Sequence, residues 1–179
     1  DRAALSIAST PLSNDLGLSH VEVGWLLSAF AWAYMIFQIP SGWAIDRFSA
    51  TRTLGAAIML WSTVALIVGA TGILPPSLAL PVIFVLIFMI GVAAAPSFPA
   101  NSKIVAVWFP ANERGTASAI FNAAQYFALA LFAPLLAWIG QGFGWQMIYE
   151  FMGVIGIISG VVFFLRVTPP WMSKRVTQE

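Results

Sequence analysis

GWAIDRFSATR, residues 42–52, is a short polar segment between two long apolar runs. It holds Asp46, Arg47 and Arg52 in a chain in which charged residues are rare. If the flanking runs cross a membrane, the polar segment between them must form a turn in water. Cytoplasmic loops are enriched in Lys and Arg, so we expect this turn to lie on the cytoplasmic side.

The composition of the whole chain is that of a membrane protein. Of the 179 residues, 60% are hydrophobic and only 8% are charged, whereas a soluble domain averages about 25% charged residues. Several runs reach the roughly 20 apolar residues that span a bilayer as a helix. We therefore expect an all-α membrane protein, the alternative being a very hydrophobic soluble bundle. The absence of cysteine excludes disulfides, thiol catalysis and Cys-ligated metals.

The apolar runs predict six transmembrane helices. Residues 1–12 have the pattern of the second half of a helix, which Pro11 and the polar cluster after it are expected to end. Because the chain starts without Met, we expect a fragment with a truncated first helix. The other five runs cover residues 21–45, 53–73, 78–109, 115–140 and 145–165. Residues 1–168 are thus predicted to form one bundle, and residues 169–179 to begin a cytoplasmic inter-domain linker.

The positive charges agree with this number of spans. The Lys and Arg residues that fall on the side of residues 42–52 are Arg47, Arg52, Lys103, Arg114, Arg166, Lys174 and Arg175. The loops expected on the other side, residues 13–20, 71–78 and 141–149, contain no Lys or Arg. This asymmetry predicts a cytoplasmic carboxyl terminus.

Polar side chains inside an apolar span are costly, so their positions are informative. In two spans they fall on one helical face, namely Tyr34, Gln38 and Ser41 in the second span and Ser118, Asn122, Gln125 and Tyr126 in the fifth. Both stripes are candidates to line a polar cavity that binds hydroxyls or carboxylates. The alternative is hydrogen bonding between helices, for which Ser, Asn and Gln are also used.

Proline and glycine suggest how two of the spans are shaped. Pro96 and Pro99 each remove a backbone hydrogen bond and predict kinks in the fourth span. Kinked or broken membrane helices often mark substrate paths. Gly156 and Gly160 form a GxxxG pattern in the sixth span, which we interpret as close helix packing.

Asp1 and Arg2 would form an ionisable pair inside the membrane if a half-helix precedes them. An arginine binds a carboxylate bidentately, and a buried aspartate can accept a proton when its pKa is raised. The alternative is the solvated start of a truncated helix. The sequence contains no metal-ligand cluster, nucleotide-binding glycine loop or catalytic triad. We therefore expect neither an enzyme nor a metal or cofactor site, and no nucleic-acid partner.

Residues 42–52 resemble the signature loop of the major facilitator superfamily, which reads roughly G-x-x-x-D-R-x-G-x-[RK]-[RK] between the second and third helices. The residues that match this pattern are Gly42, Asp46, Arg47 and Arg52. Ser49 replaces the usual glycine and Thr51 a usual basic residue. The resemblance implies that the matching residues form a cytoplasmic latch that helps set inward- and outward-facing states.

Residues 28–48, 95–139 and 143–158 resemble the anion:cation symporters of this superfamily, in particular the bacterial glucarate/galactarate and galactonate transporters. The likeness covers nearly the whole chain and implies the amino-terminal six-helix half of a twelve-helix protein of the bacterial inner membrane. Its carboxyl-terminal half would be the missing partner. Carried over residue by residue, the resemblance implies a proton-coupling residue, Asp1, and substrate-binding residues at Arg2, Tyr34, Asn122 and Gln125.

Two positions of the fourth span depart from these symporters. Where they carry an arginine and, seven residues later, a glutamate central to proton coupling, this chain has Ile87 and Ala94. Replacing both members of a buried pair can be nearly neutral, because no charge is left unpaired. The resemblance implies proton-coupled symport of a hexarate or hexonate by alternating access. The alternatives are a proton-independent facilitator or exchanger of another organic anion, and a non-transporting membrane sensor or scaffold on the same fold.

Overall fold

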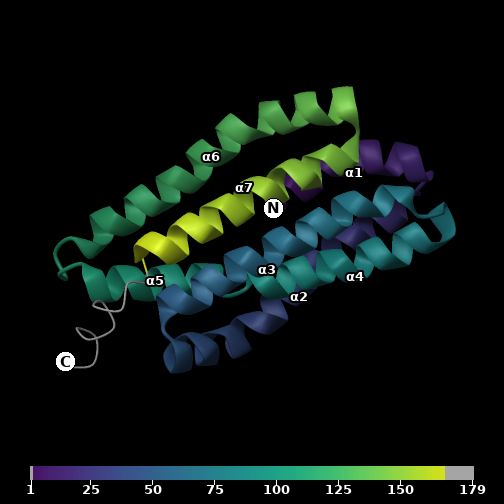
Figure 1. Ribbon diagram of the computed structural model, residues 1–179. Helices are drawn as coiled ribbons and strands as arrows, with labels where there is room; N and C mark the ends of the chain where they lie inside the picture. Colours follow the sequence, from purple (N-terminus) through teal and green to yellow (C-terminus); the bar gives the residue numbers. More distant parts are fainter. Residues whose placement is uncertain (1, 168–179) are drawn as a thin grey trace.

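The computed structural model describes residues 2–167, and every regular element in that range is helical. The elements are α1 (Arg2–Leu16), α2 (His20–Phe48), α3 (Ala50–Ala70), the 3-10 turn η1 (Thr71–Ile73), α4 (Pro76–Ala94), α5 (Ser97–Trp108), α6 (Arg114–Phe143) and α7 (Trp145–Val167) (Figure 1). The predicted all-α class is confirmed. Asp1 and the predicted linker, residues 169–179, lie outside the described range.

Five stretches of the described chain are long and apolar enough to cross a membrane. They are α2, α3 with η1, α4 with α5, α6, and α7, and they are 22 to 31 residues long. Together with α1, which has 15 residues, they make the six helical segments expected from the sequence.

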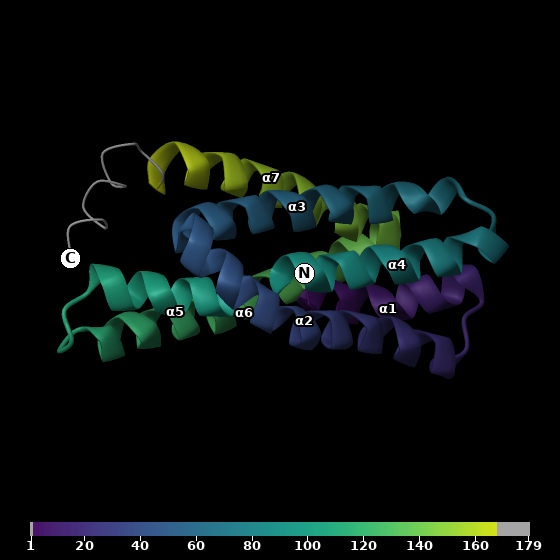
Figure 2. The ribbon, with the colours of Figure 1, turned by 90° about the horizontal axis from the view of Figure 1, so that it is seen from below.

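The helices lie along one long axis, so their connections gather at two ends (Figure 1 and Figure 2). The α2–α3 and α5–α6 connections and the end of α7 share what we call the basic end, which carries Arg47, Arg52, Lys103, Arg114 and Arg166. The α1–α2, α3–α4 and α6–α7 connections share the opposite end, which carries the acids Asp15, Glu22 and Glu150.

α3 packs along α7 through glycines of α7. A Cβ atom on Gly153 would lie 2.6 Å from Leu66 Cγ. A Cβ atom on Gly156 would overlap Ser62 Oγ, and Gly160 approaches α3 in the same way. Small residues are what allow two helix backbones to come this close in a membrane. The close packing predicted for Gly156 and Gly160 is therefore confirmed.

Two apolar clusters hold the bundle together. The larger one joins α1, α2, α3, α4, α6 and α7. The smaller one lies at the basic end, where Ile45 of α2, Leu54 of α3 and Ala100 of α5 are buried together. This smaller cluster holds the end of α2 against α3 and α5. It thereby positions the charged side chains of Asp46, Arg47 and Arg52.

Pro11 does not end α1, so that expectation is wrong. The helix continues to Leu16. Proline inside a membrane helix is tolerated because neighbouring helices and local polar groups compensate for the lost backbone bond. Here the next residue, Leu12, is fully buried in the core. Ser13 Oγ also donates a hydrogen bond to Thr10 O at 2.9 Å, which keeps this polar residue within the helix.

The fourth predicted span is broken into α4 and α5 at Ala95 and Pro96, which confirms the kink predicted for Pro96. The second expected kink, at Pro99, is wrong. Pro99 lies in the first turn of α5. The backbone N–H groups of a first turn have no helical partner, so a proline there removes nothing from the helix.

Residues 42–52 are mostly helical, so the predicted turn is far shorter than expected. α2 runs to Phe48 and α3 starts at Ala50. The helix persists because residues 43–48 include no proline or glycine to interrupt it.

Ser49 is the single residue between the two helices, and its backbone is strained. Its φ is 82° and its ψ is 137°. Within residues 2–167 it is the one residue other than glycine with a positive φ. A side chain with a Cβ atom is disfavoured in this region, whereas glycine adopts it at little cost.

Candidate functional site

The predicted polar stripe of α6 lies on an open surface of the bundle. Its residues Ser118, Asn122, Gln125 and Tyr126 are all exposed, within a run that is exposed without interruption from position 122 to position 131. Within the described range, none of these four side chains forms a hydrogen bond to another helix. The stripe therefore presents amide and hydroxyl groups to whatever covers this surface.

On α2 the predicted stripe divides into different environments. Ser41 is buried, and its hydroxyl donates a hydrogen bond to Phe37 O of its own helix at 2.6 Å. Tyr34 is half-buried, and its ring stacks on Phe30 with centroids 6.0 Å apart and an interplanar angle of 13°. Gln38 is exposed. The stacking fixes the plane of the Tyr34 ring, while Ser41 is occupied inside its helix.

The described site residues come from two different helices. α2 packs mainly on α4, whereas α6 packs on α1, α5 and α7. Tyr34 thus comes from α2, whereas Asn122 and Gln125 come from α6. Asp1 and the side chain of Arg2 lie outside the part of the chain that the structure describes.

Two of the cavities formed by the described residues have no predicted site residue in their lining. One, of about 440 Å³, lies between α5 and α6 near the basic end and is lined mostly by apolar side chains, with Asn101, Glu113 and Thr116 as polar members. The other, of about 280 Å³, lies between α1, α6 and α7 and includes Thr10, Asn14 and Gln141.

The two departures on α4 are structural parts of the core. Ile87 is 1% exposed and belongs to the larger apolar cluster, and Ala94 packs against the same cluster. A charged pair at these positions would have to be held inside the bundle, with each charge desolvated. In this chain the same space is filled by apolar atoms.

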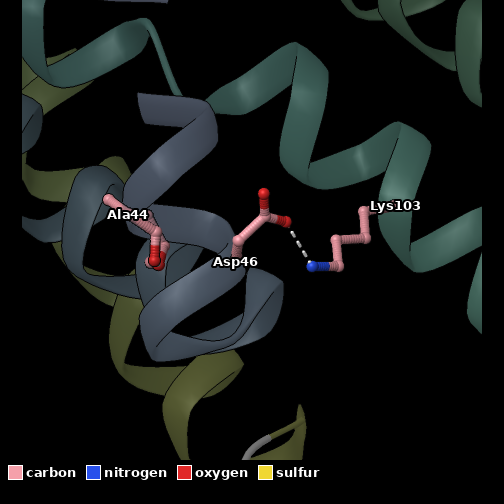
Figure 3. Close-up of polar contacts among 4 residues, drawn as sticks. Ala44, Asp46 and Lys103 are labelled. Atoms are coloured by element: carbon pink, nitrogen blue, oxygen red, sulfur yellow. Dashed lines mark hydrogen bonds and ion pairs between the residues drawn. The ribbon is translucent and has the colours of Figure 1, made fainter. Parts of the chain in front are cut away.

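Among the four residues that match the signature pattern, Asp46 has a partner that sequence reasoning missed. Lys103 Nζ of α5 lies 2.6 Å from Asp46 Oδ1 (Figure 3). Close by, Thr53 Oγ1 donates to Ala44 O at 3.4 Å, which ties the start of α3 to α2. The two residues of the ion pair are 57 positions apart, so no local pattern links them. The sequence alone identifies Lys103 only as one of the positive charges on the side of residues 42–52.

The other signature residues have different surroundings. The Arg47 guanidinium lies 5.9 Å from the ring centroids of both Trp43 and Phe48, a cation–π arrangement on its own helix. Arg52 is exposed on the first turn of α3. A Cβ atom on Gly42 would meet nothing within 4 Å, so packing inside this bundle does not require glycine there.

A polar cluster at the opposite end was also missed. Trp145 Nε1 donates a hydrogen bond to Asp15 Oδ2 at 2.8 Å, and Gln146 Nε2 donates to the same oxygen at 3.3 Å. The Trp145 ring is buried and packs edge-on against Tyr149. This cluster joins the end of α1 to the start of α7, and no local sequence signal connects residues so far apart.

Comparisons with known proteins find one transporter family and several similar bacterial proteins. The family model described as Major Facilitator Superfamily matches residues 1–179. The chain is 44% identical to the probable galactarate/D-glucarate transporter GudP of Bacillus subtilis (strain 168) over 99% of its length, and 45% identical to the probable galactarate/D-glucarate transporter GarP of Escherichia coli (strain K12) over 100%. It is 36% identical to the D-galactonate transporter of Escherichia coli O6:H1 over 99%. The matched region spans 39% to 40% of the length of these relatives.

Proposed function

Because the chain belongs to the Major Facilitator Superfamily, we propose that it forms the amino-terminal half of a secondary transporter for sugar-acid anions. The chain is a multi-pass membrane protein and, as its family and its transporter relatives indicate, not an enzyme. The relatives' names supply the substrate class, a hexarate or hexonate. The chain spans about two fifths of their length, so the proposal concerns the full-length protein.

The observation that carries this proposal is the exposed polar stripe of α6. A helix that crosses a bilayer does not leave amide groups facing lipid, because an unpaired polar group in hydrocarbon is costly. Asn122 and Gln125 are therefore assigned to substrate hydroxyls in a cavity that the carboxyl-terminal half completes. Tyr34 contributes from α2, and Arg2 binds the substrate carboxylate.

Proton-coupled symport is the favoured mechanism, with Asp1 as the protonatable group on this half. Alternating access would move this bundle against the carboxyl-terminal half around a site near the middle of the membrane. A second mechanism, proton-independent facilitation or exchange of an organic anion, is favoured by one observation. Ile87 and Ala94 place apolar atoms where the related symporters have a charged pair.

The latch and the orientation complete the proposal. Gly42, Asp46, Arg47 and Arg52 act as a latch at the basic end, with Lys103 as the partner of Asp46. The basic end faces the cytoplasm of a bacterial inner membrane, in accordance with the positive-inside rule. Residues 169–179 would then begin the cytoplasmic linker between the two halves.

Uptake of labelled glucarate by the full-length protein in proteoliposomes tests the proposal. Accumulation that requires an inward proton gradient is the expected result. Equilibration without accumulation would identify the facilitator or exchanger instead. Absence of uptake of glucarate, galactarate and galactonate, with binding retained, would reject transport and favour a sensor or scaffold on the same fold.

A further inference from the structure

α2 has two faces of different character. One face packs on α4, and a Cβ atom on Gly91 of α4 would lie 2.6 Å from Phe30 O and 2.8 Å from the Ala33 methyl carbon. The other face carries large apolar side chains that contact little of the described chain. These are Trp32, Ile36, Ile39 and Trp43, which are 57%, 53%, 84% and 63% exposed.

The exposed face does not have the composition of a helix–helix seam. Helices in membranes associate through small residues that let their backbones approach. Within this bundle the seams follow that rule, with Gly91 against Ala33 and Gly153 against α3. Trp and Ile side chains hold a second backbone away, whereas flexible acyl chains can pack around them. The composition of this face therefore favours lipid over another helix.

The exposed apolar face of α2 is followed, at the basic end, by one positively charged residue. Arg47 follows Trp43 by one helical turn, and its guanidinium lies 5.9 Å from the ring centroids of Trp43 and Phe48. The two rings meet edge to face with centroids 6.2 Å apart. Tryptophan rings with an arginine beside them are typical of the membrane–water boundary.

The charge on Arg47 is available to a ligand. Lys103, by contrast, is already paired with Asp46 at 2.6 Å. Within residues 2–167 the contacts of the Arg47 guanidinium are with aromatic rings, which leave its N–H groups free to donate. A guanidinium matches a phosphate bidentately. From Ile36 to Arg47 the helix rises about 16 Å, close to the roughly 15 Å depth of one leaflet's hydrocarbon.

We propose that this face of α2 binds one anionic phospholipid, with its phosphate on Arg47 between Trp43 and Phe48 and its acyl chains along Ile39 and Ile36. The proposal rests on the membership of a membrane family and on these contacts. It does not depend on which anion the full-length protein transports.

The headgroup is tested by native mass spectrometry of the full-length protein taken from nanodiscs that contain phosphatidylglycerol and phosphatidylcholine in equal amounts. The wild-type protein is expected to retain phosphatidylglycerol preferentially. Arg47→Gln should lower this preference by roughly fivefold, the equivalent of about 1 kcal/mol for one cation at an anionic surface. Arg166→Gln removes another exposed cation of the same end and should leave the preference unchanged. Equal loss in both variants, or in neither, would overturn a specific site at Arg47.

The acyl chains are tested by photo-cross-linking from position 39. A photoreactive amino acid in place of Ile39, in the full-length protein in the same nanodiscs, is expected to form a covalent adduct with phospholipid. A cross-linked peptide from the carboxyl-terminal half of the same chain would instead show that this face is a protein interface, and the proposal would be wrong.

Discussion

Lys103 of α5 reaches across to Asp46 at the end of α2, with 2.6 Å between Nζ and Oδ1. This contact ties the signature residues of one hairpin to the helix that follows the break at Pro96. The pair is open to solvent, since the side chains of Lys103 and Asp46 are 40% and 75% exposed. Its contribution to the stability of the bundle is accordingly small. A large loss of transport in variants of this pair would therefore indicate a role in switching between conformational states.

A double-mutant cycle with Asp46→Asn and Lys103→Gln measures this contact. We expect a coupling energy below about 1 kcal/mol in the free energy of unfolding, because exposed ion pairs are weak and screened by salt. Transport by the full-length protein should fall much further than this loss of stability explains if the pair belongs to the latch. Activity that follows stability in all three variants would reject the latch assignment.

Ser49→Gly is expected to stabilise the protein. Glycine adopts the φ of 82° found at this residue without the strain imposed by a Cβ atom. The thermal unfolding midpoint in detergent should rise, corresponding to a gain of about 1 kcal/mol. The neighbouring Thr51→Gly is the control, since position 51 lies in α3 and glycine there should lower the midpoint. A fall in both variants would mean that the corner at Ser49 is not strained.

Gly153→Ala is expected to destabilise the bundle by about 1–3 kcal/mol. The added methyl group would lie 2.6 Å from Leu66 Cγ and 2.9 Å from Ser62 O, and the second atom belongs to backbone that cannot move aside cheaply. Gly24→Ala is a matched control in α2, where a Cβ atom would meet nothing within 4 Å. The thermal midpoints of the two variants should move in opposite directions, the control upward because alanine favours helix. Equal shifts would contradict the close α3–α7 packing.

Tyr149→Phe is expected to leave stability unchanged or to raise it. The Tyr149 hydroxyl is buried and, in the described structure, has no hydrogen-bond partner, so its removal relieves a desolvated polar group. Trp145→Phe serves for comparison, because it deletes the hydrogen bond to Asp15 and should lower the thermal midpoint. A clear loss of stability in Tyr149→Phe would reveal a partner for the hydroxyl in the full-length protein.

Gln125→Ala is expected to weaken binding of the sugar acid to the full-length protein by about 1–3 kcal/mol, because substrate hydroxyls would be left unpaired. Isothermal titration calorimetry in detergent would measure this change. Gln141→Ala removes an exposed amide from the same helix, away from the polar stripe, and should bind substrate normally. Unchanged affinity in Gln125→Ala would assign the α6 stripe to contacts between helices instead.

The sequence predicted what depends on local pattern. Apolar run lengths located the spans, and the Gly156–Gly160 spacing predicted close helix packing, although it did not identify α3 as the partner. Both predictions follow from the solvent and from side-chain size. A capping box at Ser19 and Glu22, in which Glu22 N donates to Ser19 Oγ at 3.3 Å, sets the start of α2 and was readable in the sequence.

What the sequence did not predict depends on contacts between distant residues. Lys103 with Asp46, and Trp145 with Asp15, are joined only by the way the helices pack. The polar character of residues 42–52 suggested a turn, yet buried Ile45 holds most of this segment in a helix. The packing of Ile45 and the absence of proline and glycine from residues 43–48 together outweigh the polar character of this segment.

The one-residue corner at Ser49 has a mechanical consequence. A long loop between two helices lets one helix rotate without moving the other, whereas a single connecting residue allows very little independent rotation. Since α3 packs closely on α7 through glycines, a displacement of the end of α2 is expected to move α3 and, through it, α7. A movement of Asp46 or Arg47 at the end of α2 would then be a movement of α2, α3 and α7 together.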